Sequence, residues 1–216
     1  MKYYDDVKQF HDKFGMVTPP SFLHFPVDLY EFRVKFFHEE LDEYVESHAT
    51  QDLPTAIDSL IDLVYITCGT ALLHGLPSSI FDPETIGAEL PAVVNLELFK
   101  KPPTLLAIES HQELVTNITE AINLYRVGYT RISELAISTA LSNIFYHSLY
   151  GALQMGFDQK RWDMMWDDVQ RANMSKERAV RADQSKRGST YDVIKPIGWV
   201  APRSEEMIEL MLQGAA

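Results

Sequence analysis

The sequence predicts an all-α protein built as a helical bundle. Apolar side chains recur at helical spacing through most of its 216 residues. Segments in which apolar and polar residues alternate, as they do in a half-buried strand, are nearly absent. With 46% hydrophobic and 23% charged residues, the chain has the composition of an ordinary globular protein and enough length for a real core. These three observations favour the all-α class.

Three helices are expected in the first third of the chain, and glycine or proline residues lie close to their ends. The first is expected to stop at Gly15, just before Pro19 and Pro20. The third is expected to open after Asp52, with Pro54 in its first turn, and to end at Gly75. The expected spans are residues 3–14, 27–47 and 54–74.

The rest of the chain is expected to hold a connector, three long helices and a polar tail. Residues 76–104 are interrupted by proline, and we expect a short helix at 84–90 within this connector. Residues 181–203 are polar and punctuated by glycine and proline, so they read as a tail. Further helices are expected at residues 105–126, 131–155, 159–180 and 204–213.

One helix pair recurs at a fixed offset of 81 residues. Residues 36–75 superpose on 117–156 without gaps, and the stretch 51–75 alone has five identities, which include the pair Gly75 and Gly156. Two explanations stay open: a duplication, with residues 105–156 as a degenerate copy, or a chance match between similar helices. The acidic residues largely do not recur: Glu39 meets Glu120, but Glu40, Glu43, Asp58 and Asp62 meet Ala121, Leu124, Thr139 and Asn143.

Charge and cysteine content exclude several classes of protein. The formal net charge of −12 argues against a nucleic-acid binder or an acidic-membrane binder, because phosphates would be repelled. A single Cys excludes an intrachain disulfide and a cysteine-based zinc site, and it fits a reducing cytoplasm. We see neither a secretory signal nor an apolar run long enough to span a membrane, so no membrane association is expected.

The acidic residues gather on two neighbouring helices. From residue 36 to residue 62 there are eight Asp and Glu residues and no Lys or Arg. Glu39, Glu40 and Glu43 are three or four residues apart on one helix, so Glu43 shares a face with each of the others. Asp58 and Asp62, four apart on the next helix, interrupt an apolar stripe and should point toward a packed interface. Antiparallel packing of the two helices would bring these carboxylates together.

Such a cluster repels itself and needs cations to stay ionised. Mg²⁺ takes oxygen ligands and shares them with substrate phosphates, so it answers that need. The alternative is a non-catalytic regulatory or scaffold bundle, in which the acids form a solvated face. A di-iron site is disfavoured because no inward Glu-x-x-His motif is present.

At this point the chain resembles a known superfamily. Glu39-Glu40-x-x-Glu43, followed by Ala56-Ile-Asp58-x-x-x-Asp62-Leu-Val-Tyr65, is similar to the all-α nucleoside triphosphate pyrophosphohydrolases, which include MazG and phosphoribosyl-ATP pyrophosphohydrolase. The nearest resemblance is to small MazG-like proteins of bacteriophages. The chain departs from the family pattern at Ser59, where a Glu is usual, and Asp58 is the plausible substitute. Further matching motifs are Phe10-His11-x-x-Phe14-Gly15, Gly69-Thr-Ala-Leu-x-x-Gly75, Val169-Gln-Arg-Ala-Asn173-Met-Ser-Lys176 and Lys195-Pro-x-Gly-Trp-x-x-Pro202.

The resemblance implies hydrolysis of a (deoxy)nucleoside triphosphate to the monophosphate and pyrophosphate, in nucleotide-pool control. It implies a catalytic bundle over residues 1–180, with 36–75 as the active helix pair, and a substrate-covering tail over 181–216. Glu40 or Asp58 would orient or deprotonate the attacking water. The implied ligands of Mg²⁺, with Mn²⁺ as a substitute, are Glu39, Glu40, Glu43, Asp58 and Asp62.

The resemblance also bears on partners. It implies a homo-oligomer, dimer or tetramer, although the degenerate copy could make a pseudo-dimer within one chain. It further implies a cytoplasmic protein, in the host cytoplasm if a phage encodes it. A second hypothesis is that the substrate is a phosphoribosyl compound instead of a nucleoside triphosphate.

Positive charge is concentrated near the end of the chain. Residues 170–198 hold seven Lys and Arg against three acids, and such cations would bind the remaining phosphate oxygens. The resemblance implies that Asn173 and Lys176 hold the triphosphate, and Arg33 and Lys195 are further candidates. Phe10, His11 and Phe14 form either a base-stacking wall or plain core. Arg178, Arg181, Lys186 and Arg187 are expected to be solvated surface charges.

Overall fold

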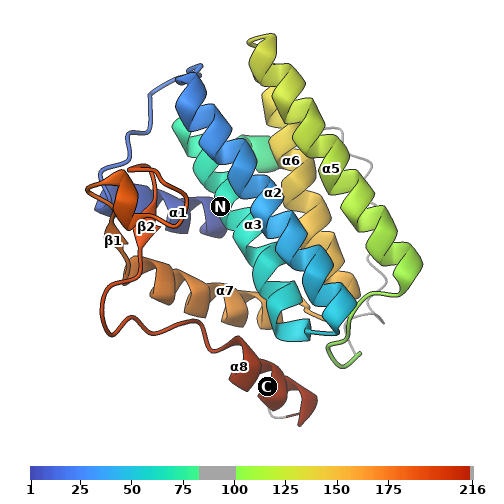
Figure 1. Cartoon of the computed structure of the whole chain (residues 1–216). Helices are drawn as coiled ribbons and strands as arrows, with labels where there is room; N and C mark the ends of the chain where they lie inside the picture. Colours follow the sequence, from blue (N-terminus) through green and yellow to red (C-terminus); the bar gives the residue numbers. More distant parts are fainter. Residues whose placement is uncertain (83–100, 215–216) are drawn as a thin grey trace.

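The computed structural model describes residues 1–82 and 101–214, and within these ranges it confirms the all-α class. The only strands in the described residues are two of two residues each, which form a small antiparallel sheet. Figure 1 shows the arrangement. The helices are α1 (Lys2–Lys13), α2 (Val27–Thr50), α3 (Leu53–Leu73), α5 (Ile108–Thr130), α6 (Glu134–Gln154), α7 (Gln159–Met174) and α8 (Ser204–Leu212), with β1 (Glu177–Arg178) paired to β2 (Val193–Ile194).

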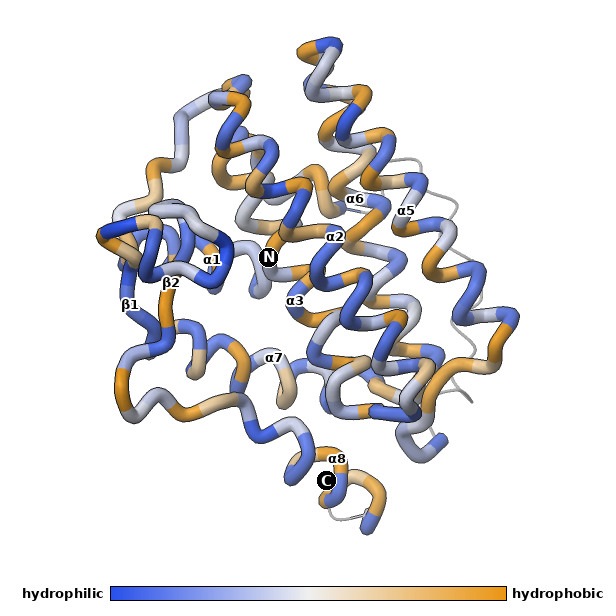
Figure 2. The backbone as a smooth tube through the Cα atoms, viewed as in Figure 1, coloured by the Kyte–Doolittle hydropathy of each residue, from blue (hydrophilic) through white to orange (hydrophobic). Residues whose placement is uncertain are grey.

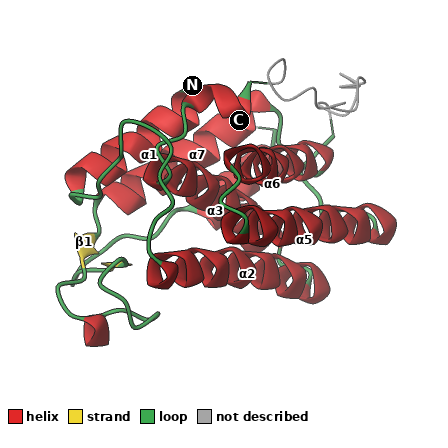
Figure 3. Ribbon diagram, turned by 90° about the horizontal axis from the view of Figure 1, so that it is seen from above, coloured by secondary structure: helices red, strands yellow, loops and turns green. Residues whose placement is uncertain are grey.

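Four long helices form the body of the molecule. Helix α2 packs antiparallel on α3, α5 on α6, and α3 also contacts α6 while α2 contacts α5. Viewed from above, these four helices run side by side (Figure 3). Helices α1 and α7 lie across them and contact α3, and α8 contacts α3 and α7. Because α3 touches most of the other helices, it is the centre of the core.

Helix α3 is long and apolar because it is surrounded. Asp52 caps it by accepting a hydrogen bond from the Thr55 amide (3.1 Å), and Pro54 sits in its first turn. Its apolar stretch is visible in Figure 2. By length and hydropathy α3 could cross a membrane, so the expectation that no such segment exists is wrong by that criterion. Since 83% of its most apolar window is buried inside the protein, it is accounted for as a core helix.

The recurrence at 81 residues extends to local structure. Helices α3 and α6 have bounds displaced by 81 residues at both ends, and α2 and α5 begin at the same offset. Gln51 and Ile132, which have a left-handed backbone although they are not glycine, are also 81 residues apart. A loop hydrogen bond recurs too: Leu23 N donates to His74 O at 2.8 Å, and Thr104 N donates to Met155 O at 2.9 Å. A duplication would produce these correspondences, although it stays a prediction.

Two sequence predictions differ from the structure or lie outside it. The helix expected over 159–180 ends at Met174, because the Ser175 hydroxyl donates to the Ala172 carbonyl (2.7 Å) and competes with the helical ladder. The chain then pairs as β1 with β2, which places Lys176 in the turn between helix and strand. The short helix expected at 84–90 lies outside the described residues.

Candidate functional site

A pocket of about 440 Å³ lies between α1, α2, α3 and the tail that contains β1 and β2. This volume is typical of small-molecule sites. One part of the wall is acidic and faces cationic side chains from the tail. The other part is mainly aromatic and aliphatic. Lining residues used below are Phe10, His11, Phe32, Arg33, Phe36, Glu40, Glu43, Asp62, Gly69, Asn173, Lys176, Lys186, Arg187, Asp192 and Lys195.

Three of the predicted carboxylates meet in this pocket. Glu40 and Glu43 come from one face of α2, and Asp62 comes from the facing turn of α3. Glu40 is 4% exposed. Burial, with a smaller contribution from the Asp62 carboxylate, raises the pKa of Glu40 well above its usual range. Burial also raises the pKa of Asp62, against the opposing effect of Lys176. The sequence-predicted convergence of acids therefore holds for this trio.

Two other predicted acids lie beside the pocket and have separate partners. Asp58 accepts a hydrogen bond from Ser204 Oγ (2.6 Å) at the start of α8, and burial raises its pKa to about 7. Glu39 forms ion pairs with Lys186 and Arg187 of the tail, and it is not among the described residues that line the pocket. Asp58, predicted as a metal ligand and as a group that orients or deprotonates the attacking water, therefore faces α8 instead of the pocket.

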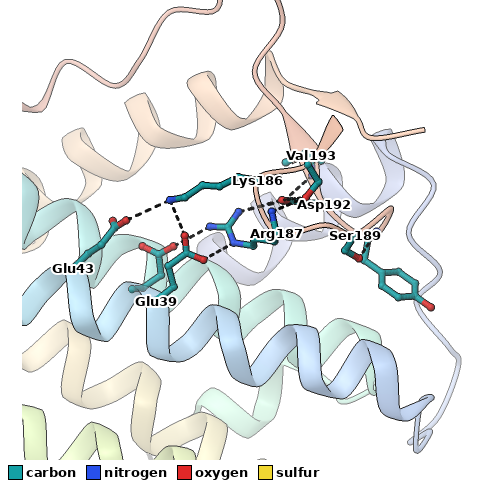
Figure 4. Close-up of polar contacts among 10 residues, drawn as sticks. Glu39, Glu43, Lys186, Arg187, Ser189, Asp192 and Val193 are labelled. Carbon is teal, nitrogen blue, oxygen red and sulfur yellow. Dashed lines mark hydrogen bonds and ion pairs between the residues drawn. The ribbon is translucent and has the colours of Figure 1, made fainter. Parts of the chain in front are cut away.

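The prediction that Lys186 and Arg187 are solvated surface charges is wrong for Arg187 and incomplete for Lys186. Arg187 Nε lies 2.7 Å from Glu39 Oε2, and its Nη2 lies 3.6 Å from Glu40 Oε1. Lys186 Nζ lies 2.8 Å from Glu39 Oε1 and 3.9 Å from Glu43 Oε1. Figure 4 shows both cations reaching from the tail to the acids of α2. The Arg187 side chain is only 15% exposed, whereas Lys186 remains 72% exposed.

The tail holds Arg187 in place from several sides. Asp192 Oδ2 lies 3.3 Å from its Nη1, and Asp192 also accepts hydrogen bonds from Ser185 Oγ and the Val193 amide. The guanidinium lies 3.9 Å from the centre of the Phe36 ring, within cation–π range. These contacts make Arg187 part of a built site. No sequence signal distinguished it from its neighbours, because 148 residues separate it from Glu39.

The other tail candidates also reach the pocket. Asn173, Lys176 and Lys195 all line it, as predicted for substrate-binding residues. Burial lowers the pKa of Lys176, and the Asp62 carboxylate opposes that effect. The Trp199 ring lies under both amines, 5.8 Å from Lys176 Nζ and 4.4 Å from Lys195 Nζ. Arg178 instead donates to Phe14 O, and Arg181 pairs with exposed Asp183.

The aromatic candidates divide between pocket and core. Phe10 and His11 line the pocket from α1. Phe14 is 7% exposed and packs against Phe10, with ring centres 4.6 Å apart, so it supports the wall from behind. Phe32 and Phe36, which the sequence did not single out as site residues, also line the pocket. Core packing therefore describes Phe14, whereas base stacking on Phe10 and His11 stays a prediction.

The pocket fits a hard divalent cation by its chemistry. Its three carboxylates offer only oxygen donors, and the burial of Glu40 and Asp62 makes an additional positive charge favourable. Among residues 1–82 and 101–214, no three acidic, histidine or cysteine side chains are already arranged around one point. Glu39, Glu40 and Glu43 are instead spaced around the tail cations. Metal binding would therefore require these side chains to rearrange.

Comparison with known proteins agrees with the site. Residues 7–91 match the family model described as phosphoribosyl-ATP pyrophosphohydrolase. The matched segment carries α2, α3 and all three pocket carboxylates. The resemblance to the all-α pyrophosphohydrolase superfamily is thereby confirmed, whereas the nearness to phage proteins stays a prediction. No curated protein and no solved structure matches the chain.

Proposed function

We propose that this protein hydrolyses a nucleoside triphosphate to the monophosphate and pyrophosphate with the help of Mg²⁺. The family match supports a pyrophosphohydrolase that acts on nucleotides. The observation that carries the finer proposal is a single pocket in which Glu40, Glu43 and Asp62 face Lys176 and Arg187. Such a site can bind a divalent cation and a polyphosphate side by side.

Each group has a role that follows from its chemistry. Glu40, Glu43 and Asp62 would hold the metal, which supplies charge neutralisation at the phosphate when bound. Lys176, Lys195 and Arg187 would bind phosphate oxygens that the metal does not reach. Glu40 is our choice for orienting the attacking water, because it lines the pocket and Asp58 does not.

The test is product analysis over a panel of nucleoside and deoxynucleoside triphosphates with Mg²⁺, and with Mn²⁺ as a substitute. We expect pyrophosphate and the monophosphate in equal amounts, and complete loss of release when EDTA is added. Release of inorganic phosphate would identify a different reaction. If no nucleotide in the panel were turned over, a non-catalytic scaffold would be the better description.

A second substrate class has its own support. The matched family is described as acting on phosphoribosyl-ATP, so this compound belongs in the same panel. Turnover of phosphoribosyl-ATP alone would replace the general triphosphate proposal. A role in nucleotide-pool control and a cytoplasmic location remain proposals that rest on the substrate.

We also infer that α5 and α6 take the place of a second subunit, which makes the chain a pseudo-dimer. The recurrence of helix bounds at 81 residues supports this, as does packing of the second pair against the first. The positions that match Arg33, Glu40 and Asp62 are Leu114, Ala121 and Asn143, and the first two of these are buried. The second pair would therefore provide core and no second metal site.

This inference predicts a catalytic unit that does not need a partner chain. We expect light scattering to give the mass of one chain, and the activity per chain to be independent of protein concentration. Mixing wild type with an inactive Glu40→Gln chain should give activity proportional to the wild-type fraction. A dimer or tetramer whose mixed assemblies depart from that proportion would contradict the pseudo-dimer and favour a site shared between subunits.

A further inference from the structure

The pocket has a second end, where Arg33 lies without an acidic partner. Arg33 is 8% exposed. Its Nε donates to Thr70 Oγ1 at 2.9 Å, and its Nη2 donates to the Ile66 carbonyl at 2.5 Å. Among the described residues, no carboxylate lies within 4.0 Å of its guanidinium. These two bonds use only two of the five N–H groups of the guanidinium, so the others are available to a hydrogen-bond acceptor on a ligand.

His11 and Gly69 meet Arg33 at the same place. His11 is 2% exposed, and its Nδ1 has no hydrogen-bond partner among the described residues. A Cβ atom on Gly69 would lie 3.1 Å from His11 Nε2 and 3.3 Å from Arg33 Nη2. Glycine at this position therefore lets two polar side chains approach α3 closely. Burial, helped by the nearby Arg33 charge, lowers the pKa of His11 to about 3, so its ring is neutral.

The distance between the two ends suits a nucleotide. Arg33 and Glu40 are seven residues apart on α2, which corresponds to about 10 Å along a helix axis. Phe10 and Phe32 line the same pocket as Arg33, and aromatic side chains stack on the face of any base. With the phosphates at the acidic end, the base would lie at the end that holds Arg33.

The chemistry of Arg33 limits which base fits. A guanidinium only donates hydrogen bonds, so its partner must be an acceptor. Guanine, hypoxanthine, uracil and thymine present a carbonyl oxygen where adenine and cytosine present an amino donor. We propose that Arg33, with His11 and the space left by Gly69, selects an oxo-bearing nucleobase over its amino counterpart. This proposal rests on the proposed function and names its substrate class.

Two matched substrate pairs test it: ITP against ATP, and UTP against CTP, which exchange an oxo group for an amino group. For wild type we expect kcat/KM to favour the oxo member of at least one pair by about 10- to 100-fold. In Arg33→Gln we expect that preference to fall to about twofold or less, with most of the loss on the oxo member. Lys35→Gln, which removes an exposed cation from the same helix, should keep the preference.

Other outcomes would overturn the proposal. An absence of preference in both pairs, or an equal loss on both members in Arg33→Gln, would make Arg33 a phosphate-binding or structural residue. If Arg33→Gln did not fold, Gly69→Ala would serve instead, and it should lower the preference because the added methyl group would displace the His11 ring and the Arg33 guanidinium. If wild type hydrolysed no nucleotide, the proposed function would fail. Calorimetric binding of IMP and UMP against AMP and CMP would then decide the base preference independently, with equal binding in both pairs counting against it.

Discussion

Replacing Glu40 by Gln should reduce pyrophosphate release by at least about 100-fold while leaving the fold intact, since an electrostatic site loses that much when a central group is removed. Glu40 is the most buried acid of the trio in the pocket and has both Asp62 and Glu43 as neighbours. Gln keeps the shape and a polar oxygen at the position that lies 3.6 Å from Arg187 Nη2, so the loss would report charge. Initial rates with saturating Mg²⁺ and circular dichroism measure the two parts of this prediction.

The same variant should be more stable than wild type, and the pH dependence of the gain follows from the pKa. The folded state raises the pKa of Glu40 above its ordinary value of 4.5, so ionising it costs folding free energy as pH rises from 4.5 through the raised pKa. Gln removes that cost. We expect Tm to rise by roughly 2–4 °C at pH 8, for a gain of about 1 kcal/mol, and the gain to vanish near pH 4.

The matched control is Glu46→Gln, because Glu46 is exposed on the same helix and does not line the pocket. This variant should resemble wild type in both turnover and pH-dependent Tm. A Glu40→Gln enzyme that turned over at the wild-type rate would remove Glu40 from the catalytic machinery. A drop in Tm at pH 8 would instead show that the Arg187 ion pair outweighs the repulsion among the acids.

Replacing Arg187 by Ala should slow turnover and at the same time strengthen metal binding. Arg187 lies 2.7 Å from Glu39 and 3.6 Å from Glu40, so its charge competes with a divalent cation for the same acids. In the proposed reaction it would also bind the triphosphate. We expect kcat/KM to fall by about 100-fold or more. We expect calorimetry to show that Mn²⁺ binds the protein alone about tenfold more tightly. The reason is that removing one adjacent positive charge changes the binding free energy of a cation by an amount of that order.

Opposite changes in metal affinity and turnover separate this role from a structural one. A merely structural Arg187 would lower both together, and the proposal would then be withdrawn. Arg187→Lys should recover part of the turnover, because it restores the charge without the two-pronged geometry. Arg181→Ala is the control, since the one ion pair of Arg181 within residues 1–82 and 101–214 is with Asp183, in an exposed part of the tail. It should leave both measurements at wild-type values.

Sequence reasoning succeeded where the determining interactions are local. Helix spans follow from apolar spacing, and the ends follow from residues such as Gly75 and the cap at Asp52, so most bounds were predicted within a few residues. The convergence of Glu40, Glu43 and Asp62 also follows from helix periodicity and antiparallel pairing. The end of α7 was not predicted, because no glycine or proline marks it in the sequence. The helix stops where Ser175 donates a hydrogen bond to the Ala172 carbonyl.

The sequence by itself determined that this protein is a bundle with acids on two neighbouring helices, because periodicity is a property of nearby residues. Only the tertiary structure decided which acids face the pocket and which cations meet them. Asp58 turns to Ser204, 146 residues away, and Arg187 reaches Glu39 across 148 residues. Arg33 is left without an acidic partner among the described residues. Such pairings depend on how the tail closes over the helices, and closure between distant segments leaves no periodic trace in the chain.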